Sequence, residues 1–591
     1  MGDKKTVGFV MSGIMDEFPE QLARGIIAEA EKDDVNIVVI PVKYIDREMK
    51  GIPDLYEYQY KTNVETITST NFDALIVAAD IIGCLTTPDN LMKFMDDLKA
   101  RGIPIVLAAS KMEDYPGVMF DNKAGIIEGI EYLVEELNVK KIGMLKSYDH
   151  NNDVAERYET FKEMLDYYKL ELDPKSVITT NLSVDCRNEC EQFLDQNPDI
   201  EAVFCVNDDV ARTFYAAMKD RGLVPGKDIK VMGFDNSISG SMMTPSLTTI
   251  DASAKNLGKR VFTMVRMIMD GWSVGQTTIP TSFILRDSFG SFLDRKNTDD
   301  AMLDKNKLDK YFHRIFFKFD NISKQEDMKI LIMYKALMNT IIDYVNDHEY
   351  SAERVAFLKI KMDEFFKTGA LEYTDADVLL AYVERMKAAI MARFDDYQRK
   401  CQAYETFSAL LEKMVKTLRD EVIEYKTSMN DSIYTLKNMV EDSLNFNHGG
   451  DESYTTIVSN LAMFGVENAY VYIYDRPIYH EQEDDFVPPK KIRLKVAMTD
   501  GDIKIIPPED QFIELDHLYD NKFLTSKKYR MVQMPLYFKE TLYGYVLYDL
   551  NDVSFRSGDF IANQYATVAR LIDILGQNDR LRTGKLERRD V

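Results

Sequence analysis

The chain has 591 residues, and because a typical domain has about 100–200, two to four domains are expected. Its formal net charge of −25 would repel nucleic-acid phosphates, and no convincing basic module offsets it, so we expect no direct nucleic-acid contact. No apolar run approaches the roughly 20 residues of a membrane helix, and MGDKKTVGFVMSG lacks the apolar core of a signal peptide. We therefore expect a cytoplasmic protein without membrane contact.

The cysteines give no disulfide framework. They are Cys84, Cys186, Cys190, Cys205 and Cys401, an odd number with one C-x3-C spacing. Such a set indicates reduced thiols in a reducing compartment. A metal site at Cys186 and Cys190 would need further thiol or imidazole ligands, and we expect neither a metal nor a cofactor.

From Lys5 to about Leu293, apolar β-rich runs alternate with amphipathic helical patterns. The predicted strands are TVGFVMS, NIVVIPV, DALIVAA, PIVLAA, KIGML, AVFCV and IKVMGFD. The helical patterns include PEQLARGIIAEAEK, NLMKFMDDLKARG, GIIEGIEYLVEEL and RYETFKEMLDYY. This alternation predicts an α/β fold with a parallel sheet covered on both faces.

Polar residues gather where these strands end, which is where parallel sheets bind ligands. Arg157 opens a helix, and the other residues follow strands: Ser12, Asp16, Phe18, Asp80, Asp121, Asn122, Asn207, Asp208, Asp235 and Asn236. Carboxylates, amides, a guanidinium and one aromatic ring suit a small polyhydroxylated or heterocyclic ligand.

Several motifs in this half resemble the effector domain of LacI/GalR-type regulators, which is related to periplasmic sugar-binding proteins. They are Asn207-Asp208 before a helix, Gly233-Phe234-Asp235, PSLTTI at 245–250 and Arg286-Asp287-Ser288, in that order. The resemblance implies a two-lobed, periplasmic-binding-protein type 1 fold over residues 1–292. No clear family contact matches residues 108–116, so the sequence does not fix the ligand. We expect a sugar-like or nucleobase-like small molecule.

The resemblance also implies ligand contacts. Arg157 would bind hydroxyl or carboxylate groups, Asn207, Asp208 and Asp235 would bind from the opposite wall, and Phe18 would cover a ligand face, with Asp80 as a further candidate. Three of these residues have a structural alternative: Asn207 and Asp208 could serve as helix caps alone, and Arg157 could form a surface ion pair. For Gly233, Thr248 and Thr249 we favour structural roles.

Members of that family that regulate transcription begin with a helix-turn-helix domain of about 50–60 residues, as the resemblance implies. Here the first predicted strand begins at about residue 6. We therefore expect no operator binding by that route.

The second half is helical at first. Residues 293–310 form a charged linker pattern, and residues 311–446 predict a helical connector. Within it, apolar residues from Phe407 to Val440 recur with an eleven-residue period, which predicts a nearly straight coiled coil. An ordinary long bundle helix is the alternative.

Residues 451–577 predict a small α/β domain, with a hairpin turning at Lys539-Glu540 and a closing helix GDFIANQYATVARLIDILG, followed by a tail at 578–591. The P-L strand, turn and G-Y-V strand resemble a GAF domain. A dimerisation and relay role is favoured over ligand binding for this domain.

No Walker loop, HExxH, GxSxG or kinase motif occurs, so we expect no enzyme activity. The leading hypothesis is a homodimeric sensor in which a small molecule closes the two lobes and the helical connector relays the change to the GAF-like domain and a downstream signalling partner. The alternatives are the regulatory portion of a diguanylate cyclase without its GGDEF domain and a transcription regulator acting through a partner.

Overall fold

The computed structural model describes twelve stretches of the chain. They are residues 4–14, 17–45, 55–148, 151–180, 186–290, 305–316, 327–346, 352–374, 376–393, 395–442, 449–484 and 486–582. The chain forms two compact units, each described by itself below. The first comprises Met1–Phe120, Ala254–Ile279 and Ser428–Val591, and the second comprises Asp121–Ser253 and Pro280–Thr427.

A parallel sheet lies at the start of the first unit. Its strands are β1 (Lys5–Met11), β2 (Val35–Pro41), β3 (Ala74–Val77), β4 (Ile105–Ala108) and β5 (Gly117–Asp121). They lie in the order β5-β4-β3-β1-β2, with β11 (Gln276–Pro280) beside β5. Every residue of β2 is buried, as in a sheet covered on both faces. The covering elements are α1 (Glu17–Ala30), η2 (Glu57–Thr66), α2 (Ala79–Ile82), α3 (Pro88–Lys99) and α9 (Ala254–Met269).

Helices α1 and α9 cross closely in the first unit. A Cβ atom on Gly25 would lie 2.0 Å from the carbonyl oxygen of Lys255, and one on Gly258 would lie 2.3 Å from that of Leu22. Only glycine fits at both positions, so these two residues allow the helix backbones to touch.

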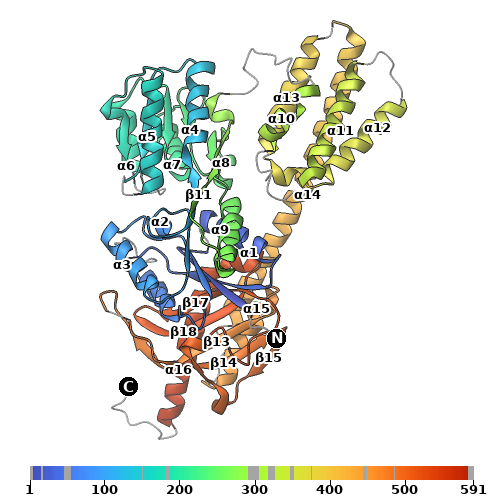
Figure 1. Ribbon diagram of the computed structural model, residues 1–591. Coiled ribbons are helices and arrows are strands. Elements are labelled where there is room, and N and C mark those ends of the chain that lie inside the picture. The colour runs from blue at the N-terminus through green and yellow to red at the C-terminus, as the bar shows by residue number, and fades with distance from the viewer. Residues whose placement is uncertain are drawn as a thin grey trace. The chain divides into compact units, whose positions relative to one another are not determined.

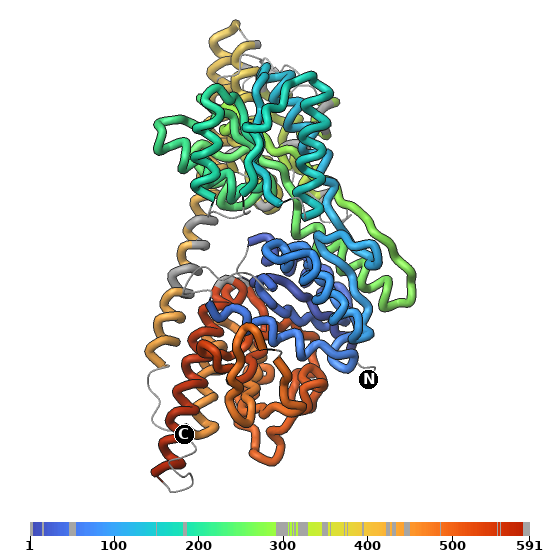
Figure 2. The backbone as a smooth tube through the Cα atoms, turned by 90° about the vertical axis from the view of Figure 1, so that its left-hand side faces the viewer, coloured from blue at the N-terminus to red at the C-terminus, as the bar shows by residue number. Residues whose placement is uncertain are grey.

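The C-terminal residues extend the same sheet. Strand β17 (Arg530–Phe538) pairs in parallel with β2, with Arg530 opposite Ile37 and Val532 opposite Val39. Beyond it follow the antiparallel strands β18 (Thr541–Asp549), β13 (Ala469–Tyr479), β14 (Lys491–Thr499) and β15 (Asp502–Ile505), with β16 (Phe512–Glu514) also paired to β14. Figures 1 and 2 both show these orange C-terminal strands beside the blue N-terminal ones. One sheet of twelve strands therefore joins the two ends of the chain.

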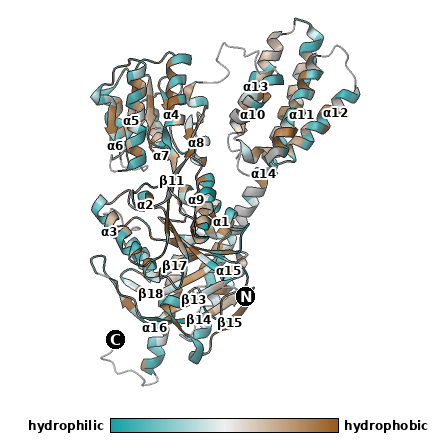
Figure 3. Ribbon diagram, viewed as in Figure 1, coloured by the Kyte–Doolittle hydropathy of each residue, from teal (hydrophilic) through white to brown (hydrophobic). Residues whose placement is uncertain are grey.

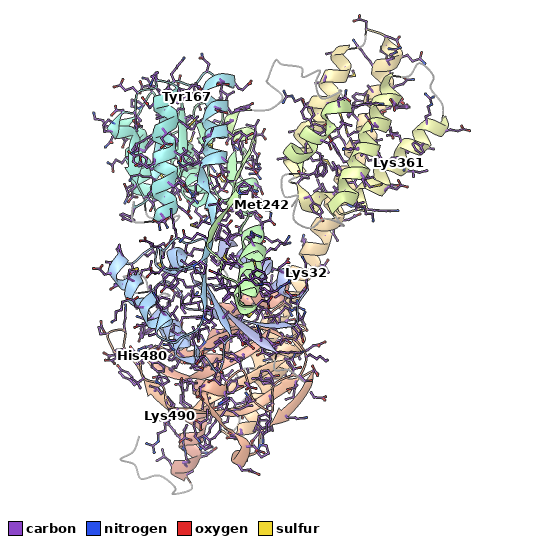
Figure 4. All side chains as sticks on the ribbon, viewed as in Figure 1. Lys32, Tyr167, Met242, Lys361, His480 and Lys490 are labelled. Carbon is purple, nitrogen blue, oxygen red and sulfur yellow. The ribbon has the colours of Figure 1, made fainter. Side chains whose placement is uncertain are left out.

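Buried polar groups and a common core hold this junction. The amide of Asn63 donates to the carbonyl oxygen of Pro41 at 2.7 Å, and Gln533 donates to the side-chain oxygen of Asn63 at 3.0 Å. His480, labelled in Figure 4, places Nδ1 3.0 Å from the side-chain oxygen of Gln59. One hydrophobic cluster contains both Val38 of β2 and tyrosines of the C-terminal strands. The junction is therefore packed as an interior rather than as a loose contact.

Two helices pack with the C-terminal strands. They are α15 (Thr455–Met463) and the long closing helix α16 (Asp552–Arg582). A Cβ atom on Gly558 of α16 would lie 2.3 Å from Cδ1 of Ile14, in the loop after β1. Lys43, just after β2, forms an ion pair of 2.5 Å with Asp559 of the same helix. Helix α16 therefore contacts the loops that follow the first two strands.

The second unit contains a four-stranded parallel sheet in the order β7-β6-β8-β9. The strands are β7 (Val177–Thr179), β6 (Ile142–Lys146), β8 (Ala202–Cys205) and β9 (Lys230–Met232). The associated helices are α4 (Asn122–Glu131), a π-helical turn (Tyr132–Glu136), α5 (Asn152–Tyr167), α6 (Arg187–Gln196), α7 (Asp208–Asp220) and α8 (Ile238–Ser241). Strands β10 (Thr249–Asp251) and β12 (Ser282–Ile284) form a separate antiparallel pair. Tyr167 and Met242, labelled in Figure 4, are largely exposed.

The helical part begins at α10 (Leu308–Ile315) and continues with α11 (Asp327–Asn346), α12 (Ala352–Phe366), α13 (Ala376–Arg393) and α14 (Tyr397–Asp442). Helices α10–α13 carry both apolar and polar stretches (Figure 3), and their buried faces share one aromatic-rich core. The predicted helix 407–440 lies within α14, which is continuous over 46 residues.

The α/β class, the parallel pairing of the strands predicted in the first half and the hairpin at Lys539-Glu540 are confirmed. The boundaries at 292, 310, 446 and 451, the GAF-like assignment and the coiled coil stay predictions. Most of the predicted linker 293–310 and of the tail 578–591 lies outside the described residues. Within the described stretches, no helix is long and apolar enough to cross a membrane.

Candidate functional site

The candidate site in the second unit is built where β6, β8 and β9 end. These three strands are neighbours and run in parallel, so the segments after them emerge at one edge of the sheet. Arg157, Asn207, Asp208 and Asp235 all come from the helices and loops after these strands. The sequence prediction that these segments carry polar side chains to one sheet edge is consistent with this placement.

Arg157 is held by three neighbours. Its Nε donates to the side-chain oxygen of Asn122 at 3.0 Å, and Nη1 donates to the carbonyl oxygen of Val206 at 2.8 Å. Its guanidinium carbon lies 3.5 Å from the centroid of the Phe234 ring. The side chain is 8% exposed, so Arg157 does not form a surface ion pair. Arg157 also lies in the second turn of α5, which is capped by Asn151, so the expectation that it opens the helix is wrong.

Two carboxylates that the sequence analysis missed lie beside Arg157. Asp153 and Glu156 each accept a hydrogen bond of 2.9 Å from the amide nitrogen of Asn122. Burial raises the pKa of Asp153 above its usual value, although the nearby Arg157 charge opposes that rise. The spacing of residues 153, 156 and 157 places all three on one helix face, and this signal was available in the sequence.

Asp235 faces the remaining edge of the guanidinium, with Oδ1 3.9 Å from Nη2 of Arg157. Its backbone has φ = 100°, a region that favours glycine, and its amide donates to the carbonyl oxygen of Ile250 at 2.9 Å. Burial raises the pKa of Asp235 to about 8, although 29% of its side chain is exposed. Arg157 lowers that pKa, while Asp208, Asp209 and Asp153 add to the rise.

Asp208 is buried, and its carboxylate accepts hydrogen bonds from two other segments of the chain. Its Oδ1 accepts from the hydroxyl of Thr249 at 2.7 Å and its Oδ2 from the amide of Ser237 at 2.7 Å. Burial raises its pKa to about 6, and these hydrogen bonds oppose the rise. A Cβ atom on Gly233 would lie 2.1 Å from Oδ1 of Asp208, which gives Gly233 the backbone role that the sequence analysis favoured.

Asn207 is the N-cap of α7, where its side-chain oxygen accepts from the amide of Val210 at 2.9 Å. Thr248 also has a structural role, because its hydroxyl donates a hydrogen bond to the carbonyl oxygen of Arg286 at 3.0 Å. The Ser288 hydroxyl donates to the carbonyl oxygen of Val231 at 2.5 Å. The motif residues around Arg286 therefore fasten the loops that carry Asp235.

Phe18 and Asp80 belong to the first unit. Phe18 lies in the first turn of α1, and not in a loop as expected, with its ring centroid 6.0 Å from that of Phe120. Asp80 lies in α2, where its backbone amide donates to the hydroxyl of Ser110 at 2.8 Å. Asp16 lies outside the described residues.

The five cysteines are free thiols, and Sγ of Cys186 lies 3.9 Å from Sγ of Cys190. Across the described stretches, no group of three or more His, Cys, Asp or Glu side chains could hold a metal ion.

The comparisons with known proteins each match less than half of the chain. Residues 130–289 match the family model of the periplasmic binding protein-like domain. The HTH-type transcriptional regulator RegA of Clostridium saccharobutylicum is 21% identical over 268 residues, which cover 45% of this chain and 75% of RegA. The HTH-type transcriptional repressor PurR of Serratia proteamaculans is 27% identical over 190 residues, which cover 31% of this chain and 54% of PurR.

Among solved structures, the transcription regulator CcpA of Lactococcus lactis is 21% identical, with a TM-score of 0.41 over 48% of this chain and 99% of CcpA. A LacI family regulator from Enterococcus faecium with bound ribose is 22% identical, with a TM-score of 0.38 over 48% of this chain and 98% of that protein.

These relatives bear on two further predictions. They are named as transcriptional regulators, in line with the prediction that the chain is not an enzyme. They are also HTH-type regulators, a DNA-binding class, so they do not support the expectation that nucleic acid is never contacted directly. Residues 130–289 of this chain are therefore similar to the periplasmic binding protein-like domain, and the chain is similar over part of its length to HTH-type transcriptional regulators.

Proposed function

We propose that this chain is a sensor for a small molecule, and that Phe18, Asp80, Arg157, Asn207, Asp208 and Asp235 are its ligand-binding residues, which either contact the ligand or position a residue that does. The wall around Arg157 supports the proposal most directly. A guanidinium that is held on three sides keeps one edge turned toward Asp235, and such fixed polar groups are what small-molecule sites use to orient a ligand. A LacI-type relative that binds ribose is consistent with a polyhydroxylated ligand here.

The six residues have different proposed roles. We assign hydrogen bonding with the ligand to Arg157 and Asp235, and contact with a ligand face to Phe18. The carboxylate of Asp208 is already engaged by Thr249 and Ser237, and so we assign it to holding the loop that carries Asp235. Asn207 and Asp80 stay in the proposed set as hydrogen-bonding groups.

In this proposal, the C-terminal α/β domain receives the conformational change that ligand binding causes and passes it on as the output signal. The pairing of β2 with β17 and the contacts of Ile14 and Lys43 with α16 mean that a shift of the N-terminal strands also shifts the C-terminal ones. This route is direct and differs from the relay through residues 311–446 that the sequence suggested. The helical residues, with the eleven-residue repeat of α14, then serve to join two copies in a homodimer.

A thermal-shift panel tests the sensor proposal. The purified chain is heated with sugars, sugar phosphates, nucleobases and nucleosides, one at a time. A compound at 100 times its dissociation constant adds roughly 2.7 kcal/mol of stability. Arg157→Lys, which loses the fork geometry, and Asp235→Asn should each abolish or sharply reduce that shift. A panel in which nothing shifts the midpoint would contradict the proposal.

Transcription regulation is the second candidate function, because the relatives carry that role in their names. A gel shift with genomic DNA fragments, at several salt concentrations, separates direct DNA binding from action through a partner. No observation favours the regulatory portion of a diguanylate cyclase over these two functions.

A further inference from the structure

We propose that Asn236 is a positioning residue of this site: its side chain holds the turn that carries Asp235 and ties that turn to two segments at which the chain passes between the units. This inference rests on the proposed sensor function and deepens it. The chain leaves the second unit after Ser253 and returns to it at Pro280. Strand β10 ends just before the first of these points, and β12 begins just after the second. Asn236 forms hydrogen bonds with residues of both segments.

The side-chain amide of Asn236 uses its donor and its acceptor at the same time. Its Nδ2 donates to Oδ1 of Asp251, the last residue of β10, at 3.0 Å. Its Oδ1 accepts from Nη2 of Arg286, which follows β12, at 2.7 Å. An aspartate at this position would offer no donor to Asp251, and an apolar side chain would offer neither hydrogen bond. The pair of hydrogen bonds therefore depends on an amide here.

The turn has a backbone conformation that needs support. Asp235 has φ = 100° and Asn236 has φ = 53°, so two successive residues lie in the region that favours glycine. Such conformations persist where the surrounding structure fixes them. The backbone amide of Asn236 donates to the hydroxyl of Thr249 at 3.4 Å, and that of Asp235 donates to the carbonyl oxygen of Ile250 at 2.9 Å. The side-chain hydrogen bonds of Asn236 hold the same turn to β10 and to the segment after β12.

The position of the Asp235 carboxylate is set by this turn rather than by Arg157. Oδ1 of Asp235 lies 3.9 Å from Nη2 of Arg157, which is too far for a hydrogen bond. A ligand that bonds to both residues would pull on the turn, and Asn236 would pass that displacement to its two partners. Arg157 has a similar tie, because it bonds to Asn122, next to the point where the chain first enters the second unit. Each of the two proposed ligand contacts is thus linked, through one asparagine, to a point where the chain passes between the units.

Asn236→Gly tests this role in the full chain without ligand, because glycine tolerates the positive φ and removes both side-chain hydrogen bonds. The readout is specific to Asp235: it is the difference in thermal midpoint between the Asp235→Asn variant and its parent, followed from about pH 6 to 9. Burial raises the pKa of Asp235 to about 8, so this difference should grow up to that pH while the carboxyl is held in place. The charged groups that act on Asp235 are Arg157, Asp153, Asp208 and Asp209.

In the Asn236→Gly background, we expect the growth of this difference with pH to fall to less than about half, because the released carboxylate reaches water and burial no longer opposes its ionisation. A general loss of stability would lower both midpoints and leave their difference unchanged. Asn138→Gly is the matched control, since Asn138 is exposed, belongs to the same unit and has φ = 54°. It should leave the difference as it is in the wild type.

Hydrogen–deuterium exchange at pH 7 gives a second readout. Peptides that contain Asp251 and Arg286 should exchange faster in Asn236→Gly and not in Asn138→Gly. An unchanged pH-dependent difference, or unchanged exchange in both peptides, would overturn the inference, and so would a wild-type chain in which Asp235→Asn has no effect at any pH. Because no ligand is used, each of these results is distinct from a thermal-shift panel in which nothing binds, which would contradict the sensor function.

Discussion

Asn122 and Arg157 are locked together, because the amide oxygen of Asn122 accepts the Nε–H of Arg157 at 3.0 Å. The same amide donates through its nitrogen to Asp153 and Glu156, both at 2.9 Å. One fully buried asparagine therefore orients a cation and two anions on α5. Such an arrangement fixes the wall of the candidate site before any ligand arrives.

Asn122→Ala should destabilise the protein by about 1–3 kcal/mol, because it leaves a buried guanidinium donor and two carboxylates without their partner. Urea unfolding measures the change. Lys123→Ala is the control, since the Lys123 side chain is half exposed and its loss should change stability by less than about 0.5 kcal/mol. Equal stability of the two variants would show that Asn122 does not organise this wall.

Stability in the absence of ligand should fall as the pH rises from about 4 to 8. Asp235 has its pKa raised to about 8 in the folded chain, so the folded state keeps a proton there that the unfolded state releases near pH 4. At high pH, folding must therefore bury an ionised Asp235 carboxylate, which lowers the stability of the folded state. Asp235→Asn should be more stable than the wild type at pH 8.5 and equal to it at pH 3.5, as measured by thermal unfolding. A variant that loses stability at pH 8.5 would mean that ionised Asp235 is well paired.

Gly558→Ala should destabilise the wild type by about 1–3 kcal/mol, because the new Cβ would lie 2.3 Å from Cδ1 of the fully buried Ile14. In an Ile14→Ala background the overlap is relieved, so the same substitution should become neutral or stabilise by up to about 1 kcal/mol through helix propensity. A double-mutant cycle by urea unfolding gives the coupling.

Gly576→Ala is the matched control for that cycle. It lies in the same helix, but its new Cβ would be 3.4 Å from the carbonyl oxygen of Gly449, a tolerable contact. It should stabilise in both backgrounds. Strict additivity of Gly558→Ala with Ile14→Ala would show that α16 does not rest on the loop after β1.

The helical core contains a paired tyrosine contact, with the hydroxyls of Tyr334 and Tyr382 3.0 Å apart. Tyr334→Phe should cost about 1–3 kcal/mol because it leaves the buried Tyr382 hydroxyl without this partner. The double change to Phe at both positions should cost less than the sum of the single changes. Unfolding followed by circular dichroism at 222 nm measures this, and additive costs would contradict the pairing of α11 with α13.

Much of the local structure could be predicted from the sequence. Strands such as β1 and β2 are buried on both faces, so they appear as continuous apolar runs. The turn at Lys539-Glu540 joins two apolar strands of nine residues each, which is a strong local signal for a hairpin. Strands β10 and β12 were missed because they are three residues long and depend on side-chain hydrogen bonds such as that of Thr248.

The pairing of β2 with β17 could not be predicted in the same way. The local sequences VNIVVIP and RMVQMPLYF contain no signal that would identify a pairing partner almost 500 residues away, because any buried strand edge offers the same backbone groups. At the candidate site, motifs identified Arg157 and Asp235. Asp153 and Glu156 match no motif, and the signal for them is their spacing from Arg157, which places all three on one face of α5. The tie between Asp208 and Thr249 depends on tertiary contact and has no signal in the sequence.

Hydrogen–deuterium exchange with and without the most stabilising compound of the panel tests the central claim most directly, since it reports binding and transmission together. We expect slower exchange in peptides that contain Arg157 and Asp235, and a concurrent change in peptides of β17 and α16 around Gly558. Protection confined to the peptides around Arg157 and Asp235, with β17 and α16 unchanged, would contradict the claim that ligand binding is transmitted through the shared sheet.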